Sequence, residues 1–374
     1  MKKIAASVGL VTLGAVALQN ANAAGLADAA GGKPWSVSAT LRGFYDDNIF
    51  TSSSTNRVDS FGMEVSPSVG YTLVQDQTSL GAKYTYSGSW YEAAQSTTLG
   101  HWSHSHEFQG DLAHAFSPRV NVLAREAFVI GQEPDSLRSG NYVINPQRIP
   151  GSNVRNNGKI VADIQVTREF SLEVGYGNNY WDYENKLNPA TDLVTFTDSS
   201  GSWTAVNQSS LSGELDRIEH LPSIEGNWLL APQTHAVLGY QFTQVNFTGD
   251  EPISGTISST STNHPVDATY SADRDSRQHT GYGGLDHTFG PDLSGSIRAG
   301  VTYRESYNSP SQPTDLAPYV SAGLNYAPTP DTSVSLNYSH DLNVSDVVGT
   351  NPANFVRGME NDVISASLTH TLSP

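Results

Sequence analysis

The segment His287–Tyr303 reads HTFGPDLSGSIRAGVTY, and it decides the fold class. A Gly-Pro-Asp turn at 290–292 is followed by apolar or small residues at every second position, with Ser, Arg, Gly and Thr between them. Such alternation predicts a β-strand with one apolar and one polar face. Proline fixes φ and has no N–H to donate, so it suits a turn at which strand pairing stops. The segment therefore predicts a strand that turns and reverses.

The same signal recurs along the chain. Proline turns stand in HAFSPRVNV (114–122), WLLAPQTHAVLGY (228–240) and YAPTPDTSVSLNY (326–338), and the chain ends on HTLSP (370–374). Alternation with a period of two runs through nearly all of residues 35–374, and long amphipathic helical patterns are absent. The alternating segments number about 14, and many reach the 9–11 residues that a tilted strand needs to cross a bilayer. The chain is expected to be all-β.

Short and long connections alternate along the chain. The short ones lie at 74–78, 117–119, 168–171, 231–233, 290–292 and 329–331. The long ones lie near 46–58, 91–101, 131–157, 183–212, 248–277, 306–314 and 345–357. Outer-membrane barrels segregate connections in this way, with short periplasmic turns and long extracellular loops. We therefore expect a transmembrane antiparallel β-barrel of 14 strands, or of 16 if the chain is truncated after Pro374. In lipid every backbone group must be paired, so the sheet is expected to close.

The N-terminus carries an export signal. Lys2 and Lys3 precede an apolar run at 4–18, and Ala21-Asn22-Ala23 supplies the small residues of a cleavage site. We expect a signal peptide at 1–23, a short periplasmic segment at 24–34 and the barrel at 35–374. The expected location is the outer membrane of a Gram-negative cell.

Composition excludes several function classes. With no cysteine, the chain has no disulfide framework and no thiolate chemistry. A formal charge of −17 makes nucleic acid an unsuitable partner. Hydrophobic residues make up 37% of the chain, which is low for a conventional core and fits a barrel with a polar interior. No nucleophile elbow, zincin motif or phosphate loop is present, so an enzyme is not expected.

The first predicted strand carries a family resemblance. The run Leu41-Arg42-Gly43-Phe44-Tyr45-Asp46-Asp47-Asn48-Ile49-Phe50, together with the repeated Ser-Pro turns, resembles the opening of β-barrel porins of the "porin 2" type. Those proteins resemble outer-membrane barrels associated with exopolysaccharide and exosortase systems. The resemblance implies an outer-membrane porin without catalytic residues. Pro374 departs from the terminal aromatic residue of familiar outer-membrane proteins.

Charged residues on the predicted polar faces are candidates for the lumen wall. Rings of charge can set ion selectivity in a pore, but the same residues can instead pair across strands and stiffen the barrel. Both interpretations stay open. On the strand 120–130, Arg125 and Glu126 cannot both face a polar interior. The lumen candidates are Arg42, Lys83, Arg125, Lys159, Arg298, Arg304, Arg357, Glu107, Asp111, Asp163 and Asp286.

Two clusters have the residue types of metal sites. Asp46, Asp47 and Asn48 could hold Ca²⁺ through side-chain oxygens, or could simply turn the chain. His104 and His106 lie on one face of a predicted strand, with His101 nearby, and that face also carries Trp102 and Phe108. A place at the outer membrane interface is favoured over metal binding for these histidines.

Aromatic residues near the long loops have two interpretations. They could stack on sugar rings, or form the aromatic belt at the membrane interface. The belt is favoured for those at strand ends, whereas Trp203 lies in mid-loop. The residues are Trp90, Tyr91, Tyr180, Trp181, Tyr183 and Trp203.

The expected function is passive diffusion of small hydrophilic solutes through a porin-like channel, with a link to polysaccharide export as an open question. The first alternative is a non-conducting structural or adhesion barrel that acts through its extracellular loops, and the second is an outer-membrane enzyme. No cofactor is expected apart from Ca²⁺ at the loops. The expected partners are outer-membrane lipid, lipopolysaccharide and the barrel-assembly machinery. A homotrimer and bound polysaccharide are open alternatives.

Overall fold

The computed structural model describes residues 34–49, 57–93, 100–132, 151–346 and 356–371, and the backbone of 137–139 and 142–145. Fourteen strands form one antiparallel sheet in which neighbours in the chain are neighbours in space, as predicted. The expected signal peptide and Pro374 lie outside the described residues. The strands are β1 (Trp35–Asp46), β2 (Ser60–Gln75), β3 (Thr78–Tyr91), β4 (Trp102–Ser117), β5 (Val120–Gly131), β8 (Asn153–Gln165), β9 (Phe170–Tyr183), β12 (Arg217–Ala231), β13 (Thr234–Phe247), β17 (Ser276–Gly290), β18 (Leu293–Glu305), β19 (Thr314–Thr329), β20 (Thr332–Val344) and β21 (Gly358–His370).

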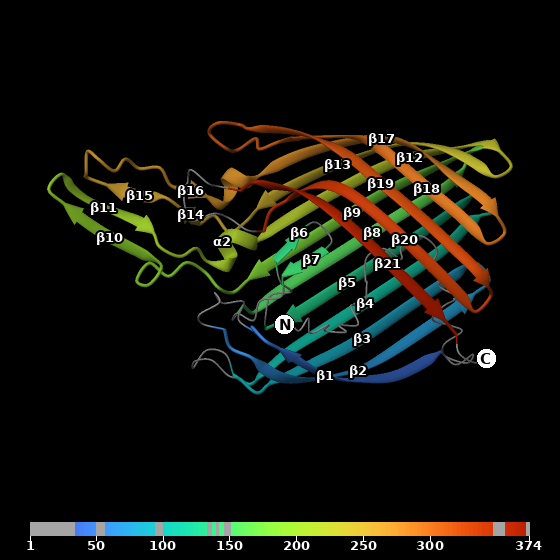
Figure 1. The fold of residues 1–374 in the computed structure, drawn as a ribbon, viewed down its shortest axis with the longest axis horizontal. Helices are drawn as coiled ribbons and strands as arrows, with labels where there is room; N and C mark the ends of the chain where they lie inside the picture. Colours follow the sequence, from blue (N-terminus) through green and yellow to red (C-terminus); the bar gives the residue numbers. More distant parts are fainter. Residues whose placement is uncertain are drawn as a thin grey trace, which may run out of the picture.

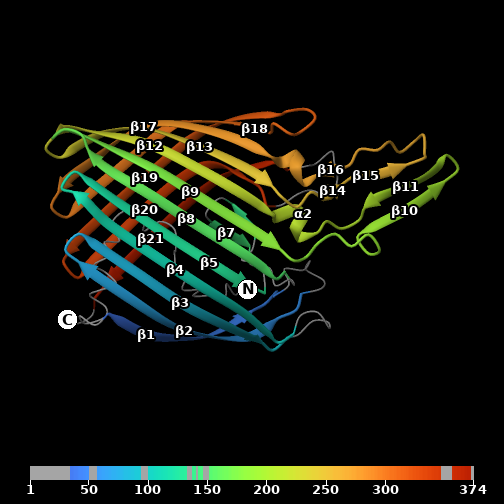
Figure 2. The ribbon, with the colours of Figure 1, turned by 180° about the vertical axis from the view of Figure 1, so that it is seen from behind.

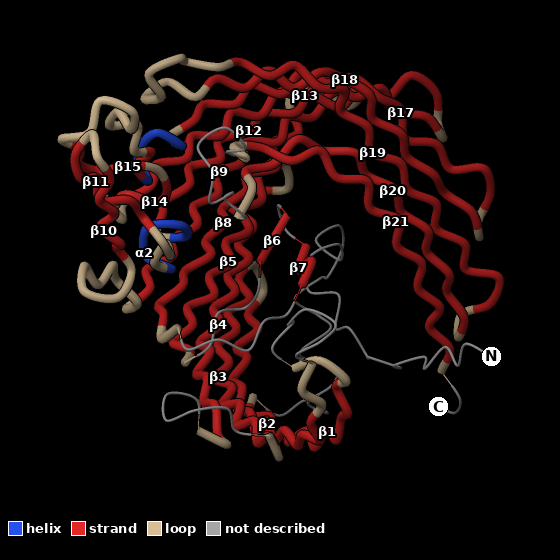
Figure 3. The backbone as a smooth tube through the Cα atoms, turned by 60° about the vertical axis from the view of Figure 1, so that its left-hand side comes forward, coloured by secondary structure: helices blue, strands red, loops and turns tan. Residues whose placement is uncertain are grey.

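The sheet curls around an interior (Figures 1 and 3). Tight turns such as Gln75–Thr78 connect the strands at one end, called here the turn end, and the long connections lie at the other, called the loop end. No ladder joins β1 to β21 in the described part of the chain, so the two outer strands are free edges here. The prediction of one antiparallel sheet of 14 strands is therefore confirmed, whereas the predicted closure is not seen among the described residues.

The apolar residues of the sheet face outward. Leu238 is 62% exposed and Ile364 is 74% exposed, and the alternating positions on most other strands behave alike. By contrast, only nine apolar residues of the described chain are buried, and several of these, such as Phe247 and Ile253, lie at the loop end. An apolar outer surface around a polar interior is the inverse of a water-soluble fold and is the arrangement of a lipid-facing barrel.

Most pairs of strands joined by a long connection have the same kind of side-chain contact at the turn end. The outward side chains of the lowest register pair contact each other as aromatic or Thr–His partners in five of the seven cases. In three of them a threonine hydroxyl lies 2.8 Å from a histidine Nδ1. The seven register pairs are Trp35/Tyr71, Thr78/His114, Val120/Ile164, Phe170/Trp228, Thr234/His287, Leu293/Tyr326 and Thr332/His370.

A second level of outward histidines lies eight residues nearer the loop end. On β4 this places His106 above His114, and on β17 it places His279 above His287. Each of the upper histidines is hydrogen-bonded to a tyrosine hydroxyl of the neighbouring strand, for example His106 to Tyr84 at 2.8 Å. His104 and His220 are bonded to Tyr86 and Tyr176 in the same manner. Two levels of amphipathic side chains thus bracket the apolar band, as at the two interfaces of a bilayer.

Two of the long connections form a structure of their own. Strands β10 (Leu193–Asp198), β11 (Gly201–Val206) and β15 (Thr256–Ser259) make a three-stranded sheet from the connections 184–216 and 248–275. It projects beyond the loop end (Figures 1 and 2). The strands β6 (Leu137–Ser139) and β7 (Tyr142–Asn145) lie on the concave side of the main sheet (Figure 3). No helix in the described ranges is both long and apolar enough to cross a membrane.

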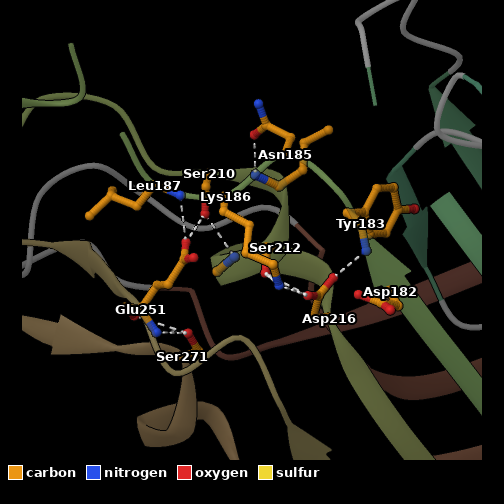
Figure 4. Close-up of polar contacts among 12 residues, drawn as sticks. Asp182, Tyr183, Asn185, Lys186, Leu187, Ser210, Ser212, Asp216, Glu251 and Ser271 are labelled. Atoms are coloured by element: carbon orange, nitrogen blue, oxygen red, sulfur yellow. Dashed lines mark hydrogen bonds and ion pairs between the residues drawn. The ribbon is translucent and has the colours of Figure 1, made fainter. Parts of the chain in front are cut away.

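Two carboxylates, one buried and one half-buried, join this extension to the main sheet (Figure 4). Helix α2 (Leu211–Leu215) is capped by Ser210, whose hydroxyl accepts from the Gly213 N–H. The Glu251 carboxylate, next to β14 (Pro252–Ser254), accepts from the Leu187 N–H at 3.0 Å and from the Ser210 hydroxyl. Asp216, just before β12, accepts from the Tyr183 N–H at 2.7 Å. These contacts fix α2 and β14 against the ends of β9 and β12. The short strand β16 (Thr269–Tyr270) and the 3₁₀-helix η1 (Ser271–Arg274) complete the region.

Candidate functional site: the lumen and its mouth

The concave side of the sheet encloses a polar cavity of about 1360 Å³. It begins at the turn Gln75–Thr78 and reaches Trp181, Arg217 and Val344 near the loop end. Most of the lining residues come from the inward-facing positions of the strands, because alternate side chains of a strand point to opposite faces. Seven carboxylates and four Lys or Arg side chains line it, so its wall is acidic at neutral pH.

Five of the predicted lumen residues line this cavity. They are Arg125, Lys159, Asp163, Asp286 and Arg298. Arg298 and Asp286 form a bidentate pair across β17 and β18, with N–O distances of 2.6 and 2.9 Å. Arg125 lies 3.2 Å from Asp111 on the neighbouring strand. Some of these charged residues therefore pair across strands and also line the cavity, so both interpretations from the sequence apply.

Four more predicted residues lie on the same face outside the cavity lining. Arg42 pairs with Glu64 at 2.6 Å between the half-exposed strands β1 and β2. Asp111 pairs with Arg125, and the Glu107 carboxylate accepts from the Gln109 amide at 2.7 Å. Lys83 lies opposite Gln109 in the register of β3 and β4. These residues belong to the wall formed by β1–β5.

A row of three carboxylates crosses the wall on adjacent strands. Asp163 on β8 is register-paired with Glu173 on β9, and Glu173 is register-paired with Glu225 on β12. The Tyr282 hydroxyl donates to Glu225 at 2.9 Å, and its ring packs against that of Tyr319. Glu173 was not among the predicted residues, although its position between outward Leu172 and Val174 marks it as a lumen residue by parity alone. The row makes this side of the lumen locally anionic.

The loop end of the lumen is crossed by ion pairs. Arg217, at the start of β12, pairs with Asp346, just after β20, at 3.0 Å. The two strands are five positions apart in the sheet, so this contact spans the interior rather than following the wall. Arg217 also stacks on the Trp181 ring at 4.1 Å. The Arg217–Asp346 pair, buried on both sides, forms a bridge across the mouth.

Further arginines hold the same bridge. Arg274 of η1 donates to the Ser345 carbonyl and to the Glu214 carbonyl, and lies 4.1 Å from the centre of the Phe247 ring. Burial and the neighbouring Arg217 guanidinium together lower the pKa of Arg274 to about 9, against the opposing effect of Asp346. The predicted lumen residues Arg304 and Arg357 are not among the residues that line the cavity. Arg304 donates to the Arg357 carbonyl at 2.6 Å, and its positive charge also lowers the pKa of Arg274.

The candidate metal residues have local partners. The Asp46 carboxylate accepts from the Asn48 N–H at 2.8 Å, which is the turn-forming interpretation of Asp46, Asp47 and Asn48. His104 and His106 face outward and bond tyrosines, as expected of interfacial residues. Within the described ranges, no three His, Asp or Glu side chains are grouped as metal ligands.

The predicted aromatic residues divide between two faces and the extension. Trp90 stacks on His101 on the outer side, as a belt residue would. The belt interpretation is wrong for Trp181, which lines the cavity beneath Arg217. Trp203 lies on the projecting sheet, where it stacks on His264 at 3.7 Å and on Phe196 at 5.4 Å. Sequence alone could not place Trp203, because the strands β10 and β11 are short and lie inside a loop.

Comparison with known proteins gives remote structural likenesses. No protein-family model matches the chain, and no curated protein matches it. A TodX monoaromatic hydrocarbon channel mutant matches with a TM-score of 0.39 and 13% identity over 91% of this chain and 89% of its own. A Pseudomonas aeruginosa FadL homologue matches with a TM-score of 0.36 and 12% identity, over 90% and 88%. The FrpB iron transporter of Neisseria meningitidis matches with a TM-score of 0.40 and 9% identity, over 89% and 61%. Likenesses this remote carry no inference about what this chain transports.

Proposed function

We propose that this chain is an outer-membrane β-barrel that acts as a channel for small hydrophilic solutes, with a preference for cations. The observation that carries the proposal is the 14-stranded sheet with apolar side chains outside and a polar cavity of about 1360 Å³ inside. A bilayer supplies the apolar surroundings that the outer face needs. The polar wall supplies a path for water and hydrated ions.

The cation preference follows from the charges of the cavity wall. Seven carboxylates against four Lys or Arg side chains give a net negative lining. Arg298 lies 2.6 Å from Asp286 and 3.9 Å from Glu225, so its charge is shared between two carboxylates. Asp163 and Glu173 stand side by side next to this group. Charged rings in a pore attract counter-ions and repel co-ions. No bound cofactor is required for this mechanism.

The proposal includes closure of the sheet by pairing of β21 with β1. Free strand edges in lipid would leave backbone N–H and C=O groups unpaired, at several kcal/mol for each group. The internal turn-linked pairs supply the register. A repeat is here two strands joined by a long connection. In five of the six turns, the last outward residue of one repeat aligns with the residue two positions after the first residue of the next repeat. Examples are His114↔Val122, where the next repeat starts at Val120, and His287↔Gly295, where it starts at Leu293. The same rule aligns His370 with Val37.

Single-channel recording in a planar bilayer tests the proposed function. The refolded barrel should give discrete steps, and a salt gradient should give a reversal potential of the sign expected for cations. An anion-selective pore would contradict the charge argument. A barrel that inserts but never conducts would favour the structural or adhesion alternative.

A further inference from the structure

One outward residue conflicts with a lipid environment. Glu126 lies on the outer face of β5, since Arg125 points into the lumen. In the register it is paired with Gly110 of β4 on one side and Gly158 of β8 on the other. Gly110 is four residues from His106 and four from His114, so Glu126 lies midway between the two histidine levels. A carboxylate at this depth in a membrane is costly, and such residues mark functional contacts.

The two glycines make a groove around this carboxylate. A groove of about 380 Å³ lies over β4, β5, β8 and β9, which are adjacent in Figure 2. Gly158 has no side chain to fill it, and the Glu126 carboxylate lies over that glycine. The groove walls combine apolar and polar side chains, among them Leu112, Ile160, Tyr176, Glu126, Asn156 and Asn178.

The polar groups of the groove are only partly matched within the described part of one chain. The described part of the chain offers the Glu126 carboxylate no hydrogen bond and no ion pair. Asn178 donates to the Glu219 carbonyl at 3.0 Å with its amide nitrogen. That nitrogen also lies 3.3 Å from His220 Nδ1, an atom that the Tyr176 hydroxyl contacts more closely, at 2.7 Å, so the second N–H of the amide has only a long, shared contact. Asn156 and Asn178 therefore bring donors to the same patch in which Glu126 is an acceptor.

These observations favour a second copy over other occupants. A patch that holds both donors and acceptors is self-complementary, which is the requirement of an interface between identical copies related by a two-fold axis. Glu126, Gly158 and Asn178 are register partners on three adjacent strands, so Gly158 separates acceptor from donor. Rotation by 180° about an axis near Gly158 brings the acceptor side of one copy toward the donor side of the other.

We propose that this groove is a self-association surface, at which the Asn156 and Asn178 amides of one copy donate to the Glu126 carboxylate of the other. The proposal rests on the membrane insertion argued above. In the dimer, Leu112 and Ile160 of the two copies exclude lipid from the polar contacts. The interface differs from the projecting loop structure and leaves each lumen separate.

Thiol cross-linking in outer membranes tests the dimer, because the chain has no cysteine of its own. Ile160→Cys reports the groove, and Leu285→Cys on β17 is the control, since the two residues are 47% and 46% exposed. With a short bifunctional maleimide, the groove cysteine should give a band of twice the chain mass in at least ten-fold greater yield than the control. Adding Glu126→Leu should lower that yield several-fold, whereas Glu126→Gln should retain most of it.

Three outcomes would overturn the proposal: equal yields at the two cysteines, a yield unchanged by Glu126→Leu, or a cross-linked band of another mass. Heat-modifiable mobility on gels establishes that each variant is folded. If the folded barrel is in the membrane fraction but monomeric, only the dimer fails. If it is not in the membrane fraction at all, the proposed function fails.

Discussion

At the scale of one residue, Glu173 shows how strongly a single carboxylate of the lumen wall acts on a permeating ion. It has a carboxylate on each side in the register, Asp163 and Glu225, with no intervening cation. A charge about 8 Å from a permeating ion in water is worth about 0.5 kcal/mol, a factor of about two in ion concentration. Single lumen charges should therefore tune selectivity without abolishing conduction.

We expect Glu173→Gln to lower the cation-to-anion permeability ratio by about two-fold. The control is Asp182→Asn on the outer face of the same strand, which should leave the ratio unchanged. Reversal potentials in a ten-to-one salt gradient measure both. An equal effect of the two substitutions would show that the selectivity comes from overall charge and not from the lumen row.

Asp216 gives the contact between extension and sheet a dependence on pH. Burial raises the pKa of Asp216 to about 6, against the hydrogen bonds from Ser212 and Tyr183 that favour its ionised form. A carboxyl whose pKa is raised in the folded state stabilises the fold fully below its unfolded pKa, and this contribution is lost as pH rises through about 6.

Hydrogen exchange around α2 should therefore be slower at pH 5 than at pH 7, after correction for intrinsic rates. Asp216→Asn should reduce the difference, because asparagine does not titrate. The Val69 region of β2 serves as the internal reference, because β2 lies six positions from β12 in the sheet. Faster exchange at pH 5 would contradict the assignment.

At the scale of elements, the strands were predictable and the loop structure was not. Alternation and proline turns located all 14 strands of the sheet, because a strand with one lipid face and one lumen face must alternate. The same alternation explains why the consecutive residues Arg125 and Glu126 point to opposite faces of β5. The arginine bridge could not be predicted, since Arg217 and Asp346 are brought together by curvature of the sheet and by no local pattern. The projecting sheet depends likewise on pairing between two separate connections, as Thr204↔Ser258 illustrates.

The proposed closure makes an element-scale prediction. If His370 aligns with Val37, Ala39 aligns with Leu368, and the pair Ala39→Cys/Leu368→Cys should form a disulfide under mild oxidation. Disulfides need Cα atoms within about 7 Å, so pairs shifted by two residues, Ala39→Cys with Ala366→Cys or His370→Cys, should form far less. Equal or absent cross-linking in all three folded variants would contradict direct closure and point to further strands between β21 and β1.

At the scale of the whole molecule, the cavity and its mouth act in series. The cavity provides a wide polar path, whereas the Arg217–Asp346 bridge crosses its loop end. Breaking a buried ion pair costs about 3–5 kcal/mol, enough to shift the local conformation substantially. The bridge is therefore expected to set the open fraction of the channel, while the wall sets its selectivity.

Asp346→Asn should increase the open fraction or the conductance, since Arg217 loses its ionic partner across the mouth and keeps the pair with Glu219 of its own strand, at 2.8 Å. Asp198→Asn, on the exposed projecting sheet, is the matched control and should behave as the parent protein. Single-channel recordings distinguish a longer open time from a larger step. Unchanged recordings with Asp346→Asn would mean that the bridge does not limit the path.

The assignment of one face of the sheet to lipid and the other to water underlies all of these expectations. A cysteine scan of 171–178 on β9, in barrels inserted in lipid vesicles, tests it most directly with a charged, membrane-impermeant thiol reagent. Reactivity should alternate, high at the odd positions such as Glu173 that face the lumen and low at the even positions such as Val174 that face lipid. Uniform reactivity along the strand would contradict the membrane barrel itself.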